Sequence, residues 1–226
     1  MPRDVRDAFP GDGTHLERYA RRFSCVEINS SFYRPHRATT YDRWARSVPA
    51  DFRFALKLPK DITHIRRFID AGEPLLRFLD ESSALGAKRY VVLVQLPPSF
   101  AYDARVVEPF FALLRARYAG RVACEPRHAS WFEAAPDALL AASRIARVAA
   151  DPAPVAAAAT PGGSPALRYW RLHGSPRTYY SSYDGARLDA IALALSAGDG
   201  DAWCIFDNTT LGAATANALA VSDALG

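Results

Sequence analysis

The chain has 226 residues, half of them hydrophobic, which suits one large domain with a sizeable core. Its net charge is +4, but 28 basic and 24 acidic residues are mixed along the chain without a block of like charge, so nucleic-acid binding is only weakly supported. No apolar run is long enough to span a membrane, and residues 1–13 lack the apolar core of a signal peptide, so we expect a cytoplasmic protein without membrane contact.

Seven strand-like runs alternate with amphipathic or alanine-rich segments. The runs lie at residues 25–32, 52–58, 90–96, 121–127, 144–151, 167–173 and 202–208. The predicted helices include 38–47, 73–86, 105–119, 136–143, 186–197 and 210–225. Alternation of strand and helix implies parallel strands with right-handed crossovers, so the chain is predicted to be an α/β protein, either a doubly wound sheet or a closed barrel.

Two further features concern organisation. The segment 150–166, rich in alanine, proline and glycine, is predicted to be a long, partly disordered loop inside one domain of residues 1–226, because the alternation resumes after it. Cys25, Cys124 and Cys204 lie in separate predicted strands without CxxC spacing, which favours reduced, buried thiols over a zinc site or disulfides.

Polar residues recur on one face of the predicted strands. In the first run, CVEINSSFYR, Val26 and Ile28 share one face, while Glu27 and Asn29 share the other. Sorted in this way, every run offers a polar inward residue near its carboxyl end; the set is Glu27, Asn29, Lys57, Gln95, Glu125, Arg127, Asp151, Arg171, His173 and Asp207. Carboxyl ends of barrel strands carry the chemistry of such enzymes, so we expect one polar pocket there. The alternative is a set of ion pairs that plug the interior, since four acids face three bases.

Several motifs occur in an order that resembles a known family. They are VEINSSFYR (26–34), FRFALKLPKDITH (52–64), QLPPSF (95–100), EPRHASW (125–131), YWRLHG (169–174), YYSSYD (179–184) and FDNTTLGAATANAL (206–219). Together they resemble the YecE-like family, catalogued as domain of unknown function 72. The resemblance covers most of the chain and implies a TIM-like (β/α) barrel, with no established biochemical function.

The start of the chain departs from the family pattern. Members usually open with a strand that carries a motif such as GTSGW, whereas the segment 17–29 here already matches the family's first helix and second strand. We therefore expect seven recognisable strands, with the N-terminal strand missing or replaced. Either the chain is truncated or the barrel is open on one side, which would leave residues 25–32 as an exposed edge with Glu27 beside the gap.

Three chemistries remain open for the pocket. Carboxylates with His128 and His173 are of the types that bind divalent metals, but no HxH or HExxH pair exists and the nearby bases repel cations, so no metal is predicted. A metal-free acid/base site is the second. The third is an anion site formed by Lys57, Arg127 and Arg171, with His64 and His173 near. Aromatic residues in the loops after the strands can stack on a sugar or base: Tyr33, Trp131, Tyr179, Tyr180 and Tyr183.

The expected function is an enzyme, of hydrolase or lyase type, that acts on a small polar or phosphorylated substrate. The predicted catalytic residues are Glu27, Glu125, His173 and Asp207. The predicted substrate-binding residues are Asn29, Tyr33, Lys57, His64, Gln95, Arg127, His128, Trp131, Asp151, Arg171 and Tyr180. The alternative is a non-catalytic protein that binds a nucleotide or nucleic acid. The sequence identifies no cofactor.

Overall fold

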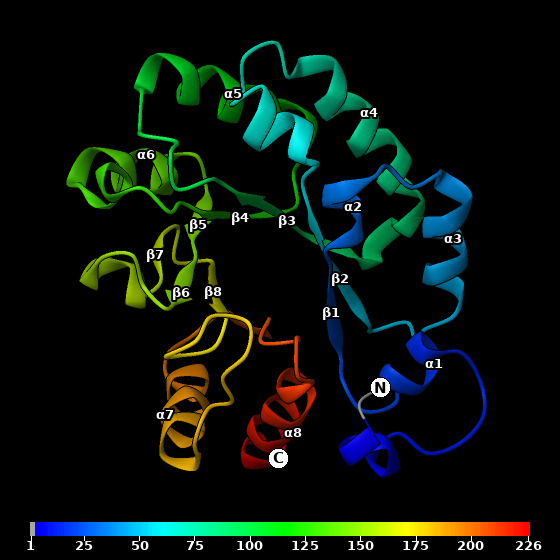
Figure 1. Ribbon diagram of the computed structural model, residues 1–226. Coiled ribbons are helices and arrows are strands. Elements are labelled where there is room, and N and C mark those ends of the chain that lie inside the picture. The colour runs from blue at the N-terminus through cyan, green and yellow to red at the C-terminus, as the bar shows by residue number, and fades with distance from the viewer. Residues whose placement is uncertain (1–2) are drawn as a thin grey trace.

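The computed structural model describes residues 3–226 and shows an α/β fold built mainly from parallel strands (Figure 1). The strands are β1 (Cys25–Ile28), β2 (Arg53–Lys57), β3 (Arg89–Gln95), β4 (Arg121–Glu125), β5 (Ile145–Arg147), β6 (Ala149–Asp151), β7 (Gly162–Gly163), β8 (Leu167–Leu172) and β9 (Asp201–Phe206). The α-helices are α1 (His15–Tyr19), α2 (Ser30–Tyr33), α3 (Ala38–Arg46), α4 (Gly72–Ser82), α5 (Ala104–Arg117), α6 (Ala134–Ala142), α7 (Gly185–Ser196) and α8 (Ala213–Leu225). Short 3-10 or π turns occupy Arg3–Ala8, Asp61–Ile65, Ser83–Lys88, Ala129–Phe132 and Ala156–Ala159.

Each predicted strand overlaps an observed one, but two segments differ from expectation. β1 stops at Ile28 rather than continuing to residue 32, because Asn29 adopts helical backbone (φ −88°, ψ −18°) and begins α2. The segment 150–166 is not a plain loop, since it contains a 3-10 turn and β7, which pairs with β5. Of the N-terminal stretch, residues 1 and 2 lie outside the described residues. No helix within residues 3–226 is long and apolar enough to cross a membrane.

The strands form two sheets, and the chain passes from the first sheet to the second between β5 and β6. The first has the order β1-β2-β3-β4-β5-β7, parallel except for the antiparallel β5–β7 pair, and the second has the parallel order β6-β8-β9. Only Val148 separates β5 from β6, and its N–H donates to Cys124 O (2.8 Å). The described strands do not form a closed barrel, because β1 and β9 are sheet edges.

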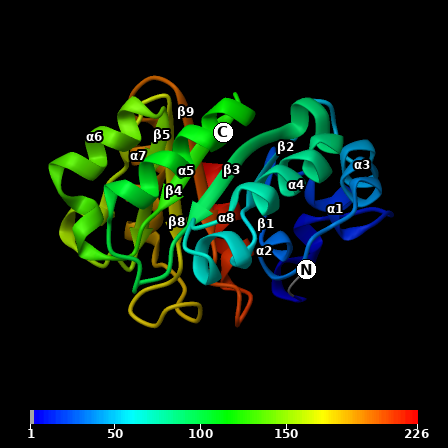
Figure 2. The same cartoon turned by 90° about the horizontal axis from the view of Figure 1, so that it is seen from above.

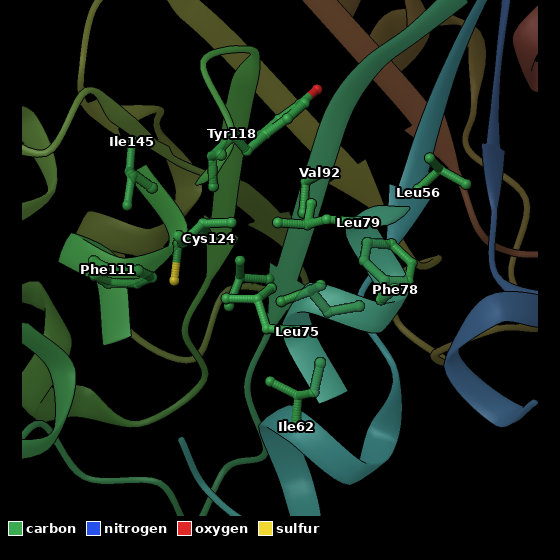
Figure 3. Packing of buried hydrophobic residues seen from close by; sticks show 14 of the residues in the cluster. Leu56, Ile62, Leu75, Phe78, Leu79, Val92, Phe111, Tyr118, Cys124 and Ile145 are labelled. Atoms are coloured by element: carbon green, nitrogen blue, oxygen red, sulfur yellow. The ribbon is translucent and has the colours of Figure 1, made fainter. Parts of the chain in front are cut away.

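The strands bury apolar side chains on both faces. On the outer face, residues such as Leu56, Val92 and Cys124 pack against helices α4 and α5 (Figure 3). Figures 1 and 2 show these helices along the outside of the curved row of strands. Period-two alternation sends the intervening residues inward, where the two sheets face each other across a second cluster: Ala55, Val91, Leu93, Ala123, Ala146, Val148, Leu167, Tyr169 and Trp203. The polar inward residues thus follow this packed apolar layer toward the carboxyl ends of the strands.

The edges of β1 and β9 border a groove. Its volume is about 630 Å³, and it is lined by β1, β9 and small side chains of α8, including Ala214 and Ala218. An ion pair between Arg22 and Asp223 links the chain after α1 to α8 beside this groove. The expectation that the strand beginning at Cys25 is a sheet edge is confirmed.

Candidate functional site

The ends of β1 and β2 are tied together by one buried hydroxyl. Ser31 Oγ of helix α2 lies 3.1 Å from Ile28 O and 2.7 Å from Lys57 O, the terminal carbonyls of the two strands. The one hydroxyl proton can be shared between these two carbonyls, so the contact bridges the two strand ends. It thereby holds Glu27 and Lys57 beside each other at the carboxyl end of the sheet.

Arg171 of β8 is the centre of a buried ion cluster. Its Nη1 donates to Glu125 Oε2 (2.5 Å), and its Nη2 donates to Glu27 Oε1 (2.8 Å) and Asp207 Oδ2 (2.9 Å). Its Nε donates to Glu27 Oε2 (3.1 Å), which also accepts from the Tyr169 hydroxyl (2.8 Å). The Arg171 side chain is fully buried. The guanidinium is therefore the shared counter-ion of three carboxylates that come from three different strands.

His173, which follows β8, lies between two of these carboxylates. Its Nε2 is 3.2 Å from Glu125 Oε1, and its Nδ1 is 3.2 Å from Asp207 Oδ2, without hydrogen-bond geometry in the second contact. Arg127 Nε donates to the same Glu125 oxygen (2.9 Å). Burial opposes protonation of His173, but the contacts with Asp207 and Glu125 outweigh it and raise its pKa.

The two carboxylates are held in the charged form. Burial alone would raise the pKa of Glu125, yet Arg171, with His173 and Arg127, holds this pKa well below the usual value. Burial is likewise outweighed at Asp207, where His173 and Arg171 lower the pKa. Ionised carboxylates with lowered pKa values are weak bases, so His173 is the group in this cluster that can best exchange a proton near neutral pH.

Lys57 lies at the edge of the cluster without an acidic partner. Its side chain is 8% exposed, and its Nζ lies 4.0 Å from the centre of the Phe32 ring. Among residues 3–226, no carboxylate oxygen is within 4 Å of Nζ and no side-chain hydrogen bond forms there. Burial, followed by the charge of Arg171, lowers the pKa of Lys57 to about 8.

His64 extends this basic side of the site. Its ring meets the Phe32 ring edge-on, with the centroids 4.9 Å apart, and its Nδ1 is 2.8 Å from Thr63 Oγ1. Burial lowers the pKa of His64 to about 4, with further lowering by surrounding cations, namely Lys57, Arg127, Lys60 and Arg67. A neutral imidazole among four cations marks a region of positive potential, which favours an anionic ligand.

Three buried polar atoms at these strand ends have no partner with hydrogen-bond geometry among residues 3–226. They are Asn29 Oδ1 after β1, His173 Nδ1 after β8 and Asn208 Oδ1 after β9. Asn29, Glu27 and Asp207 also line the groove between β1 and β9, which thus reaches the ion cluster.

Asp151 does not join the site, contrary to expectation. Ala146 and Val148 of the same chain segment face inward, so the alternation sends Asp151 outward. There it accepts from Arg187 Nη2 of α7 (2.9 Å). Its strand therefore contributes no charged group, and the cluster contains three acids and three bases rather than four and three.

The burial of Trp131 contradicts its predicted stacking role, whereas substrate binding by His128 stays a prediction. Trp131 is completely buried, and its Nε1 donates to Phe100 O (2.8 Å), so its ring cannot stack on a ligand. His128 caps the 3-10 turn Ala129–Phe132 by accepting from Ser130 N (3.2 Å). Both residues therefore stabilise the loop after β4.

The other predicted residues have mixed positions. Gln95 is buried at the end of β3, in register with Glu125. Tyr33 is 78% exposed beside Phe32, whereas Tyr180 lies against the Arg177 guanidinium, 3.8 Å from ring centre to Cζ. Tyr183 is buried, and its hydroxyl accepts from Gly174 N (2.8 Å).

Sequence reasoning missed two supporting residues, Tyr169 and Ser31. Tyr169 shares the inward face of β8 with Arg171, so strict alternation could have identified it. Ser31 lies in a segment predicted as strand, and no sequence pattern indicated that its hydroxyl ties two strand ends. Within residues 3–226, no group of three or more His, Cys, Asp or Glu side chains is arranged to hold a metal ion.

Comparisons with known proteins agree with this architecture. Residues 5–226 match a family described as "Protein of unknown function DUF72". A region of 87 residues is 34% identical to the UPF0759 protein YecE of Escherichia coli strains K12 and O157:H7; it covers 38% of this chain and 32% of the relative, so the match spans about a third of the curated relatives' length.

Two solved structures of DUF72 family proteins have a similar fold. EF0366 from Enterococcus faecalis V583 superimposes with a TM-score of 0.79 at 23% identity, over 93% of each chain. TM1631 from Thermotoga maritima MSB8 gives a TM-score of 0.72 at 25% identity, over 90% of this chain and 85% of the other. The matched family covers nearly the whole sequence, and the chain therefore belongs to the DUF72 family.

Proposed function

We propose that this protein is an enzyme that acts on a small anionic substrate by acid/base chemistry, of hydrolase or lyase type, at the carboxyl ends of the strands. The proposal includes a TIM-like barrel with one open side as the scaffold. The observation that carries it is a buried histidine, His173, held between two ionised carboxylates, Glu125 and Asp207. Titratable groups whose pKa is shifted by burial together with specific charged partners are concentrated at functional sites.

The roles follow from which groups are already paired. Arg171 is enclosed by three carboxylates, so we assign it to holding the cluster together rather than to binding an anion. Arg127 shares Glu125 with Arg171 but is 24% exposed, so we assign it to binding a phosphate or carboxylate; Lys57, which has no acidic partner within residues 3–226, lies at the same strand ends. His173 transfers the proton, while Glu125 and Asp207 orient its ring and stabilise its charged form.

The direction of the pKa shifts supports this division. The sequence favoured Glu27 and Glu125 as the acid and base, but a Glu125 carboxylate with a strongly lowered pKa is a poor proton acceptor. The raised pKa of His173 favours its protonated form, so this ring is the better proton donor of the cluster. Turnover that depends on protonated His173 falls as the pH rises through this raised pKa.

The test measures binding and turnover separately. Calorimetry with inorganic phosphate measures anion binding, and a panel of small phosphorylated and carboxylated compounds is screened for turnover by mass spectrometry. We expect Arg127→Gln to weaken binding at least about tenfold, and His173→Gln to keep binding while turnover falls about 10² to 10⁴-fold. Arg105→Gln, at an exposed site with 89% of the side chain accessible, is the matched control. Unchanged turnover in His173→Gln would refute the proposal.

A non-catalytic nucleotide-binding protein is the second candidate. The exposed rings of Tyr33 and Tyr179 favour it, because aromatic faces near cations can stack on a base. In that case nucleotide binding weakens steeply with added salt, and no panel compound is turned over. A cytoplasmic location belongs to the same proposal and is supported by three free cysteines, which suit a reducing compartment.

A further inference from the structure

Lys57 is an unusual choice of base for this chain. Of 28 basic residues, three are lysines: Lys57, Lys60 and Lys88. Lys88 donates to Ala45 O (2.5 Å) and Val48 O (2.7 Å), and Lys60 is exposed. Arginine is always charged, so it can replace lysine as a cation but not as a neutral amine. Lys57, at the end of β2, can therefore react as a neutral amine, which an arginine at the same position could not do.

The surroundings of Lys57 suit a nucleophilic amine. Its stem is buried, its Nζ lies over the Phe32 ring, and no carboxylate within residues 3–226 pairs with it directly. Burial and the neighbouring Arg171 lower its pKa to about 8, so a substantial share of the amine is neutral at slightly alkaline pH. Catalytic lysines that attack carbonyl groups are activated in this way, by desolvation and by a neighbouring cation.

The neighbouring groups define the substrate class. Arg127 carries positive charge at the same strand ends and is partly accessible, so it can hold a carboxylate or phosphate. His64, whose low pKa keeps it neutral, shares the Phe32 ring with Lys57 and is available to move protons. The fitting compound is thus a small aldehyde or ketone that carries an anionic group.

We propose that Lys57 is the nucleophile of this site and forms an imine with the carbonyl carbon of a small anionic aldehyde or ketone. This inference rests on the proposed function and names its substrate class. The lone pair of Nζ attacks the carbonyl carbon, and the carbonyl oxygen takes up a proton to give a carbinolamine. The nitrogen then loses one proton, the hydroxyl group takes up a proton and leaves as water, and the protonated imine that results loses its remaining nitrogen proton to give the carbon–nitrogen double bond. Amine and carbonyl compound thus become imine and water, with no oxidant or reductant.

Reductive trapping tests the proposal on the full-length protein. The protein is incubated with pyruvate or with dihydroxyacetone phosphate and then treated with sodium borohydride. The hydride adds to the imine carbon and a proton to the nitrogen, so a stable secondary amine results. Peptide mass spectrometry then locates the adduct among the three lysines and the amino terminus. We expect at least tenfold more adduct on Lys57 than on Lys60 or Lys88 with one or both probes.

Two variants and a pH series sharpen the result. Lys57→Arg keeps the charge and is expected to abolish the specific adduct, while Lys60→Arg, three residues away on the surface, is expected to retain it; circular dichroism checks that both are folded. The rate of trapping should rise through a midpoint near pH 8, as the amine loses its proton. No adduct on Lys57 with either probe, or equal labelling of Lys60, would overturn the inference.

The outcome is separable from that of the proposed function. Loss of turnover in His173→Gln without an adduct on Lys57 leaves the acid/base proposal standing and removes the imine. An adduct on Lys57 that forms equally well in Arg127→Gln and His173→Gln supports the amine chemistry and contradicts the roles assigned to those two residues.

Discussion

At the scale of single residues, the decisive group is Arg171, because three carboxylates, two of them buried, depend on one guanidinium. Removing one member of a buried ion pair leaves charges without a partner and costs about 3 to 5 kcal/mol. We expect Arg171→Met to lower the free energy of unfolding by about this amount at pH 7, measured by urea denaturation. Arg46→Met, which breaks an exposed pair with Asp42, is the control and should cost less than about 1 kcal/mol.

The pH dependence of this loss follows from the lowered pKa values of Glu125 and Asp207. A carboxyl whose pKa is lower in the folded state adds stability above its unfolded pKa, and this stability disappears as the pH falls through the folded pKa. In Arg171→Met these pKa values rise, so protonation begins at higher pH and relieves the unpaired charge. The difference between the two proteins should shrink below about pH 4. A difference that is constant with pH would contradict the assigned ion pairs.

At the scale of elements, the break at Val148 decides which residues reach the site. The inward positions of the β5–β6 segment are occupied by Ala146 and Val148, and Asp151 points out to Arg187. Arg187 is 49% exposed, so this ion pair is screened and contributes at most about 1 kcal/mol. We expect Asp151→Asn to leave anion binding unchanged and to lower the urea midpoint only slightly.

The comparison variant is Glu27→Gln, whose carboxylate is buried against Arg171. It should reduce stability by several-fold more than Asp151→Asn, because the buried guanidinium loses a charged partner. Equal effects of the two substitutions, or loss of phosphate binding in Asp151→Asn, would mean that Asp151 belongs to the site.

The sequence was informative where geometry is local and repetitive. Period-two alternation correctly placed Glu27, Lys57 and Arg171 on the inward face, because the pleat of a strand fixes side-chain direction whatever its surroundings. The prediction for Asp151 was wrong. The inward residues of this segment are Ala146 and Val148, so the same alternation places Asp151 on the outward face. Alternation also could not show that Trp131 fills the core or that Arg171 is enclosed by three acids, because those facts depend on contacts between distant segments.

At the scale of the whole molecule, the open side between β1 and β9 remains the main departure from a closed ring of strands. β1 pairs with β2 alone and β9 with β8 alone among the described strands, whereas β3 is paired on both sides. A sheet edge presents unpaired backbone groups and opens more readily than a central strand. Both edges also carry members of the ion cluster or directly precede them, since Glu27 lies on β1 and Asp207 follows β9.

Hydrogen exchange followed by mass spectrometry can compare these strands within one sample. We expect amides of β1 and β9 to exchange at least about tenfold faster than those of β3, which has partners on both sides and is buried on both faces. Phosphate should slow exchange at the carboxyl ends of β1 and β9 if the anion stabilises the cluster, and Arg127→Gln should remove this protection. Protection of β1 equal to that of β3 in a dilute sample would mean that another polypeptide segment covers the open edge in solution.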